Sequence, residues 1–277
     1  MLHETGRVRM IDWNDAFDNS GHVPGSERLA GLWAERAGEF RAGVLAKGRA
    51  ELDLAYGPAP RNRLDLFRPE GDPAGLVMFV HGGYWHKLDK SFWSHLAAGP
   101  LAEGWAVAMP SYTLAPRARI ADITREIGEA VGFAAGRVSG PLRLIGHSAG
   151  GHLVSRMICD DSPLPDAVAA RLARVVSLSG VHDLRLLLGI AMNDTLRLDK
   201  AEAAAESPVL HARRGEVPVT FWVGAGERPE FLRQNRLIAE AWQGPGVNDV
   251  YEPGQNHFTV LEGLGRPDSP LIRELLR

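Results

Sequence analysis

A serine set among glycines offers the clearest chemistry in this chain. The segment GHSAGG, residues 146–151, follows the apolar run LRLI and precedes a stretch whose apolar residues recur at helical spacing. A G-x-S-x-G motif between a strand and a helix is typical of a nucleophile on a sharp turn, with helix amides beside it. Ser148 is therefore the candidate nucleophile. An ordinary Gly-rich strand-to-helix turn is the alternative, because the pentapeptide alone is a weak signal.

The segment HGGYW directly follows another apolar run, GLVMFV. In acyl transfer a negative oxygen develops on the attacked carbonyl, and backbone N–H groups must point at it. Gly82 and Gly83 let the backbone approach a substrate closely, so their amides and that of Ala149 form the predicted oxyanion hole. For Tyr84 and Trp85 two interpretations stay open: core packing, or substrate binding by at least one of the rings.

A nucleophilic serine needs a base and an acid, which an α/β-hydrolase supplies in the chain order Ser, acid, His. His257, in the polar stretch EPGQNHF after the last strand candidate, is the predicted base. Glu227 stands near the end of the seventh strand candidate and is the favoured acid. Glu230 falls in the first turn of the next helix, where a carboxylate suits the helix dipole without catalytic purpose. Asp183, after the sixth strand candidate, is the third candidate.

Alternating strands and helices must position these residues. The strand candidates after residue 75 are LVMFV, WAVAMP, LRLIG, VVSLSG, VTFWVG and VNDVYEPG, several of them apolar throughout, as in strands buried on both faces. Helical patterns lie between most of them, which favours a mostly parallel sheet with helices on both faces. ELDLAYG and NRLDLFR alternate apolar and polar residues and predict a half-buried antiparallel hairpin. We expect one α/β domain over residues 1–277 with about eight strands.

Apolar periodicity also places several helices. Residues 29–47 form one, and Pro229 suits the first turn of another that ends near Trp242. The repeating apolar residues of the first are Leu29, Leu32, Trp33, Ala37 and Phe40. Segment 184–206 is predicted to form cap elements over the site. Its leucines are candidates for core, lid or dimer contacts, so a homodimer stays open.

Composition narrows the classes of function. The net charge is −3, so there is no basic field to attract nucleic acid or an anionic membrane. Cys159 is the only cysteine, which excludes an internal disulfide and predicts a buried thiol. The N-terminus has no apolar h-region, and no stretch approaches the roughly 18 apolar residues that span a bilayer. A cytoplasmic protein acting on a small molecule is the expectation.

HGGYW together with GHSAGG, SGVHDL, GERPEFLRQ and NHF resembles the kynurenine formamidase (arylformamidase) branch of the α/β-hydrolase fold, over roughly residues 11–265. The resemblance implies hydrolysis of N-formyl-L-kynurenine by Ser148, Glu227 and His257, with no metal or cofactor. It also implies that FDNSGHVP lies over the mouth of the site, within a cap segment 1–48. The acid in this family is often Asp, and the Glu found here weakens the choice of Glu227 over Asp183.

One rival hypothesis is another kind of hydrolase, and the others are proteins without hydrolase activity. General carboxylesterases of short acyl esters share these motifs, so the substrate is less firmly indicated than the family. A catalytically dead hydrolase used for binding is disfavoured because all three triad positions carry competent residues. A Rossmann dinucleotide domain is discarded, since no Gly-rich stretch matches G-x-G-x-x-G after the first strand.

Overall fold

The structure, a computed structural model, describes residues 11–277 and is built around one eight-stranded sheet in the order β1-β2-β4-β3-β5-β6-β7-β8. The β1–β2 and β2–β4 pairs are antiparallel, and every other neighbouring pair is parallel. The strands are β1 Ala50–Ala55, β2 Arg63–Phe67, β3 Leu76–Val80, β4 Ala106–Pro110, β5 Leu142–His147, β6 Leu172–Leu178, β7 Val219–Gly224 and β8 Val247–Glu252. The predicted fold class, a mostly parallel eight-stranded α/β-hydrolase sheet, is confirmed.

The apolar strands are buried on both faces, as their sequences predict. In β3, Leu76, Met78 and Val80 belong to one apolar cluster, while Val77 and Phe79 belong to another. Because successive side chains of a strand point to opposite faces, the two clusters are the two layers of core on either side of the sheet.

The hairpin of β1 and β2 fits its prediction only in part. β1 alternates half-buried and exposed residues, whereas four of the five residues of β2 are buried. The prediction of a half-buried strand is therefore wrong for β2. The physical reason is its position, because β2 pairs with β1 on one side and β4 on the other. A helix also covers it, with the rings of Phe40 and Phe67 edge-on at 5.7 Å between centroids.

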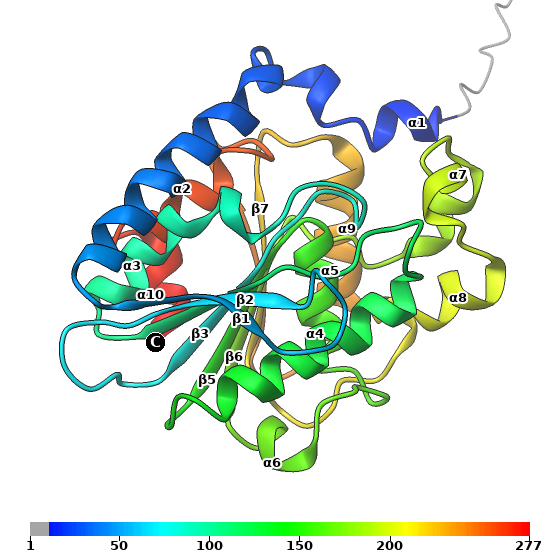
Figure 1. Ribbon diagram of the computed structural model, residues 1–277. Helices are drawn as coiled ribbons and strands as arrows, with labels where there is room; N and C mark the ends of the chain where they lie inside the picture. The colour runs from blue at the N-terminus through cyan, green and yellow to red at the C-terminus, as the bar shows by residue number, and fades with distance from the viewer. Residues whose placement is uncertain (1–10) are drawn as a thin grey trace, which may run out of the picture.

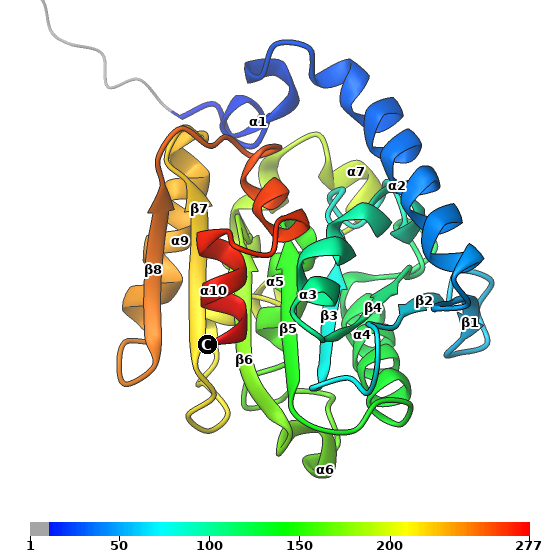
Figure 2. The same cartoon turned by 90° about the vertical axis from the view of Figure 1, so that its left-hand side faces the viewer.

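Helices cover both faces of the sheet (Figure 1, Figure 2). One face carries α4 (Ile120–Ala135), α5 (Ala149–Arg156) and α9 (Pro229–Ala241), and the other carries α2 (Leu29–Ala46), α3 (Ala98–Ala102) and α10 (Pro270–Leu276). The shorter helices are α1 Trp13–Ala16, α6 Asp166–Ala169, α7 Asn193–Leu196 and α8 Lys200–Ala205. Both α2 and the start of α9 at Pro229 match their predictions, although Leu32 of the expected apolar stripe is 51% exposed.

Two segments lie over the end of the sheet at which the parallel strands finish. Residues 11–28, including α1, pass across this edge toward α2, and α7 lies near α1 (Figure 1, Figure 2). A hydrogen bond joins the two segments, with the Ala191 amide donating to Asn14 Oδ1 at 2.8 Å. Of the cap segment 1–48 expected from the sequence, residues 1–10 lie outside the described residues.

The sequence predicts a buried Cys159 and no membrane-spanning segment. Cys159 is buried, and burial raises the pKa of its thiol to about 12, so it is protonated at neutral pH. Within residues 11–277, no helix is both long and apolar enough to cross a membrane.

Buried histidines make the stability of this fold depend on pH. Burial lowers the pKa of His81 and His95 to about 4 and that of His152 to about 3, so all three are neutral when folded. In the unfolded chain they take up protons near pH 6.5. The unfolded state therefore binds more protons as pH falls from about 6.5 toward 4, and the free energy of unfolding must decrease over that window.

Urea unfolding at pH 7.5, 6.5 and 5.5 measures this dependence. His95 is the best probe, because neither ring nitrogen has a hydrogen-bond partner among residues 11–277. His95→Phe is expected to lose less stability between pH 7.5 and 5.5 than the wild type. An unchanged loss in the variant would show that His95 does not contribute to the dependence.

Candidate active site

The chain turns sharply at Ser148, between the end of β5 and the start of α5. Its backbone has φ 56° and ψ −117°, a conformation that a residue with a side chain rarely adopts. A Cβ on Gly146 would lie 2.1 Å from the Gly150 carbonyl oxygen, and one on Gly150 would lie 2.0 Å from the Val80 carbonyl oxygen. The glycines of the motif are thus required by close backbone packing, and the turn presents a buried serine at the C-terminal edge of the sheet.

The loop after β3 lies directly against this turn. A Cβ on Gly82 would be 2.8 Å from the His147 carbonyl oxygen and 3.0 Å from the Ser148 Cβ, and Gly83 has φ +108°. Gly82 and Gly83 line the same pocket as Ser148. Ala149 is the first residue of α5, so its amide has no acceptor within the helix. The structure therefore brings all three predicted oxyanion-hole residues next to the candidate nucleophile.

Glu227 and His257 meet at the same edge of the sheet. His257 Nδ1 lies 2.7 Å from Glu227 Oε2, and both side chains are almost completely buried. The other carboxylate oxygen, Oε1, accepts hydrogen bonds from the Ser179 hydroxyl at 2.5 Å and from the Gly224 amide at 2.8 Å. His257 lines the pocket together with Ser148. The acid and the imidazole are thus hydrogen-bonded beside the pocket that contains the serine, and these are the three kinds of side chain that a Ser-His-acid triad uses.

The other two candidate acids form ion pairs with arginine side chains. Glu230 forms a two-point ion pair with Arg233, at 2.8 Å for each oxygen. Asp183 pairs with Arg185 through both of its oxygens, at 2.8 and 2.9 Å. Neither carboxylate hydrogen-bonds His257, so the geometry favours Glu227 among the three candidates.

His147, inside the G-x-S-x-G motif, supports the candidate base. Its Nε2 lies 2.8 Å from the His257 carbonyl oxygen, and the two rings pack with centroids 4.7 Å apart. Burial holds the pKa of His147 well below its usual range, so the ring is neutral and Nε2–H is the donor. His147 therefore donates to the loop that carries the candidate base.

Tyr84 and Trp85 have different surroundings. Tyr84 lines the pocket, and its hydroxyl donates to the Phe17 carbonyl and accepts from Asn19 Nδ2 at 3.3 Å. Burial raises the pKa of Tyr84, which keeps the hydroxyl protonated. Trp85 is 0% exposed and does not line the pocket, and its indole N–H donates to His152 Nδ1 at 3.3 Å. Of the two interpretations left open, core packing fits Trp85, whose ring is buried against α5, and Tyr84 is the ring that lines the pocket.

These two rings also hold a strained loop. Tyr84, Trp85 and Leu88 have φ values of 48°, 57° and 66°, in the left-handed region that residues with side chains usually avoid. Such strain costs about 1–3 kcal/mol per residue and persists only where surrounding contacts fix the backbone. Burial of Trp85 and the hydroxyl contacts of Tyr84 provide those contacts. The rings of HGGYW thus shape the loop that presents the Gly82 and Gly83 amides.

The pocket over Ser148 has a volume of about 490 Å³. Aromatic side chains form much of its wall, and residues of the N-terminal segment and of the segment after β6 also line it. These residues are Phe17, Trp33, Trp93 and Phe258 among the aromatics, with Asn14, Asp18, Asn19 and Ser20 from the N-terminal segment and Ile190 and Met192 from the other. Ser26, His86 and Lys87 add further polar groups to the lining. Phe17, Asp18, Asn19 and Ser20 lie in FDNSGHVP, the segment that the family resemblance places over the mouth of the site. Trp93 had no such signal, since it reaches the pocket only through the fold.

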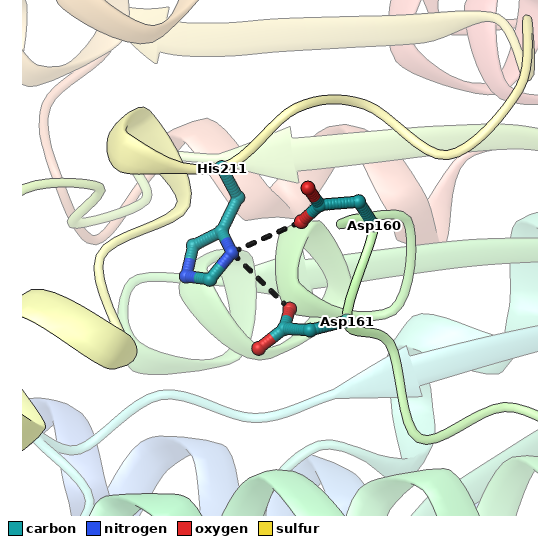
Figure 3. A group of neighbouring side chains, drawn as sticks. All are labelled: Asp160, Asp161 and His211. Atoms are coloured by element: carbon teal, nitrogen blue, oxygen red, sulfur yellow. Dashed lines mark hydrogen bonds and ion pairs between the residues drawn. The ribbon is translucent and has the colours of Figure 1, made fainter.

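One group of side chains elsewhere has the composition of a metal site. Asp160, Asp161 and His211 place their ligand atoms within 4.8 Å of one another at the surface (Figure 3). The carboxylate of Asp161 already forms a two-point ion pair with Arg156, at 2.7 and 2.8 Å. His211 Nε2 lies 2.7 Å from the Ala205 carbonyl oxygen. The group is therefore accounted for by ion pairs and hydrogen bonds that link the end of α5 to the chain after α8.

The sheet order, the serine turn after β5, the acid after β7 and the histidine after β8 define an α/β-hydrolase. Comparisons with known proteins agree. The BD-FAE family matches residues 64–222, more than half of the chain, and the protein belongs to this family. It is accordingly a hydrolase.

Several relatives and solved structures match most of this chain. Kynurenine formamidase of Danio rerio is 27% identical over 82% of this chain and 80% of its own length. That of Drosophila melanogaster is 28% identical over 80% and 79%. A crystal structure from Silicibacter sp., provisionally described as a thioesterase, has a TM-score of 0.92 at 46% identity and covers 97% of this chain and 100% of its own. An esterase of Pyrobaculum calidifontis, at 17% identity and a TM-score of 0.65 over 90% and 89%, shares the fold.

Proposed function

We propose that this protein is a serine hydrolase that cleaves an aryl formamide, N-formyl-L-kynurenine, into L-kynurenine and formate. The observation that carries the proposal is the Glu227–His257 hydrogen bond at 2.7 Å beside a pocket that also contains Ser148. The likeness to kynurenine formamidases over about four fifths of both chains supports the choice of substrate.

The proposed reaction begins when Ser148 Oγ attacks the formyl carbon and His257 takes the hydroxyl proton. The amides of Gly82, Gly83 and Ala149 stabilise the oxyanion that forms. His257 then gives the proton to the aryl nitrogen, the C–N bond breaks and L-kynurenine leaves. Water, deprotonated by His257, attacks the formyl-enzyme and releases formate, which restores the serine. Throughout, Glu227 holds the imidazole in the required tautomer and stabilises its charged form.

The lining of the pocket suits an aryl amino acid. Aromatic walls from Phe17, Trp33 and Phe258 offer stacking and edge contacts to a substrate ring. Asp18 and Lys87 also line this pocket, and their side chains carry a negative and a positive charge. A zwitterionic α-amino acid group presents the opposite charge to each of them, and a simple acyl ester presents neither.

A general carboxylesterase is the second candidate function. Isoprenylcysteine α-carbonyl methylesterase ICME of Arabidopsis thaliana is 33% identical over 37% of this chain and 26% of its own length. The Silicibacter protein is provisionally described as acting on thioesters. Esters and thioesters are hydrolysed through the same kind of tetrahedral intermediate, and their binding does not require the charged side chains of Asp18 and Lys87. Selectivity between substrates separates the two candidates.

Asp18→Asn tests whether the charge of Asp18 recognises the substrate ammonium. Loss of an ion pair with the substrate ammonium is expected to raise KM for N-formyl-L-kynurenine about 10-fold, equivalent to about 1.4 kcal/mol, with little change in kcat. The same variant should hydrolyse p-nitrophenyl acetate with unchanged kinetics. Glu27→Gln is the matched control, because Glu27 lies in the same segment but does not line the pocket. An equal effect of Asp18→Asn on both substrates would contradict recognition of the ammonium.

A further inference from the structure

Ser179 directly follows β6 and is completely buried. Its backbone has φ +50°, in the left-handed region that serine rarely occupies. The Ser179 amide donates to the Trp222 carbonyl oxygen of β7 at 2.7 Å, which fixes the backbone at this point. The strained conformation is thus maintained by the sheet, and it determines where the hydroxyl lies.

That hydroxyl donates to Glu227 Oε1 at 2.5 Å. The Gly224 amide donates to the same oxygen at 2.8 Å, while the other oxygen, Oε2, faces His257 Nδ1 at 2.7 Å. The two donors come from the ends of different strands, β6 and β7. Two hydrogen bonds on one carboxylate oxygen restrain rotation of the group and leave only the other oxygen for the imidazole.

We propose that Ser179 is a positioning residue of the catalytic acid, a proposal that rests on the proposed function. Glutamate has more rotatable bonds than aspartate, so ordering its carboxylate costs more conformational entropy. Ser179 offsets part of this cost by holding the Glu227 carboxylate in the plane and at the distance that His257 requires. The hydroxyl acts through Glu227 and touches neither the substrate nor the imidazole.

Two substitutions separate the hydroxyl from the backbone strain. Ser179→Ala removes the hydroxyl and keeps a side chain at φ +50°, whereas Ser179→Gly removes the hydroxyl and relieves the strain. Each is expected to lower kcat for N-formyl-L-kynurenine about 10- to 100-fold, the range of one hydrogen bond to a charged group, with KM unchanged. Ser177→Ala, two residues earlier in β6 and equally buried, is the matched control and should retain kcat. Full activity of either Ser179 variant would overturn the proposal.

A double-mutant cycle with Glu227→Ala shows whether the effect passes through the acid. In that background Ser179→Ala is expected to cost less than about 3-fold, because the group it positions is gone. An equal loss in both backgrounds would overturn the proposal and indicate a general effect on folding. If Glu227→Ala alone were fully active, the triad itself would fail, a result distinct from failure of the role of Ser179.

Discussion

Ser148→Ala is expected to reduce turnover by about 10,000-fold or more, because no other group at the turn can form the acyl-enzyme. Ser148 is the residue that the strained turn after β5 presents to the pocket, which Gly82 and His257 also line. Loss of one hydroxyl leaves the packing of the turn intact, so the variant should fold. Labelling by a fluorophosphonate probe, which requires an activated serine, should disappear together with turnover.

Ser155→Ala provides the matched control. Ser155 lies on α5, is completely buried, and uses its hydroxyl to bond the Gly151 carbonyl oxygen at 2.9 Å. Ser155 lies on the helix that follows the turn and does not line the pocket. Loss of its buried hydroxyl should therefore leave activity within about 3-fold of the wild type. Wild-type turnover by Ser148→Ala would remove the serine mechanism altogether.

Glu227→Ala is expected to lower kcat about 1,000- to 10,000-fold, since His257 would lose the partner that sets its tautomer and stabilises its charge. Among residues 11–277, the only carboxylate hydrogen-bonded to the His257 ring is that of Glu227, at 2.7 Å. Glu230→Ala is the comparison, because Glu230 lies three residues away and pairs with Arg233. We expect Glu230→Ala to cost some stability through the lost ion pair and to leave kcat nearly unchanged.

Kinetics of the two glutamate variants, measured beside their urea unfolding curves, distinguish chemistry from stability. A low kcat with a normal unfolding midpoint identifies the acid. The reverse ranking, with Glu230→Ala the slower enzyme, would move the acid to α9 and would leave the buried Glu227–His257 pair without a catalytic explanation.

Much of the fold could be predicted because its signals are local. The run of β3 is apolar throughout because both faces of the strand are buried, so a short window of sequence contains the signal. Residues 29–47 likewise predicted α2 to within one residue of its end. β2 was misjudged because its burial depends on β4 and on α2, which lie far away in the chain.

The candidate site was predictable to the extent that its residues occupy fixed places relative to strands. Ser148, Glu227 and His257 each follow a strand end, and motif and chain order point to them, although the sequence left Glu230 and Asp183 open as alternative acids. Ser179 and the partner of His147 had no such signal, because each contact joins loops brought together only by the folded sheet. Trp85 was ambiguous for the same reason, since an aromatic residue beside a glycine loop can face either the pocket or the core.

Preference for N-formyl-L-kynurenine over simple esters is the central claim of the proposed function. The most direct test is to measure kcat/KM for N-formyl-L-kynurenine, p-nitrophenyl acetate and p-nitrophenyl butyrate, with Ser148→Ala as the blank. A formamidase is expected to prefer formylkynurenine by at least about 100-fold, roughly 2.7 kcal/mol of transition-state stabilisation. Faster hydrolysis of the esters, with formylkynurenine barely turned over, would contradict the formamidase assignment and leave a carboxylesterase with the same triad.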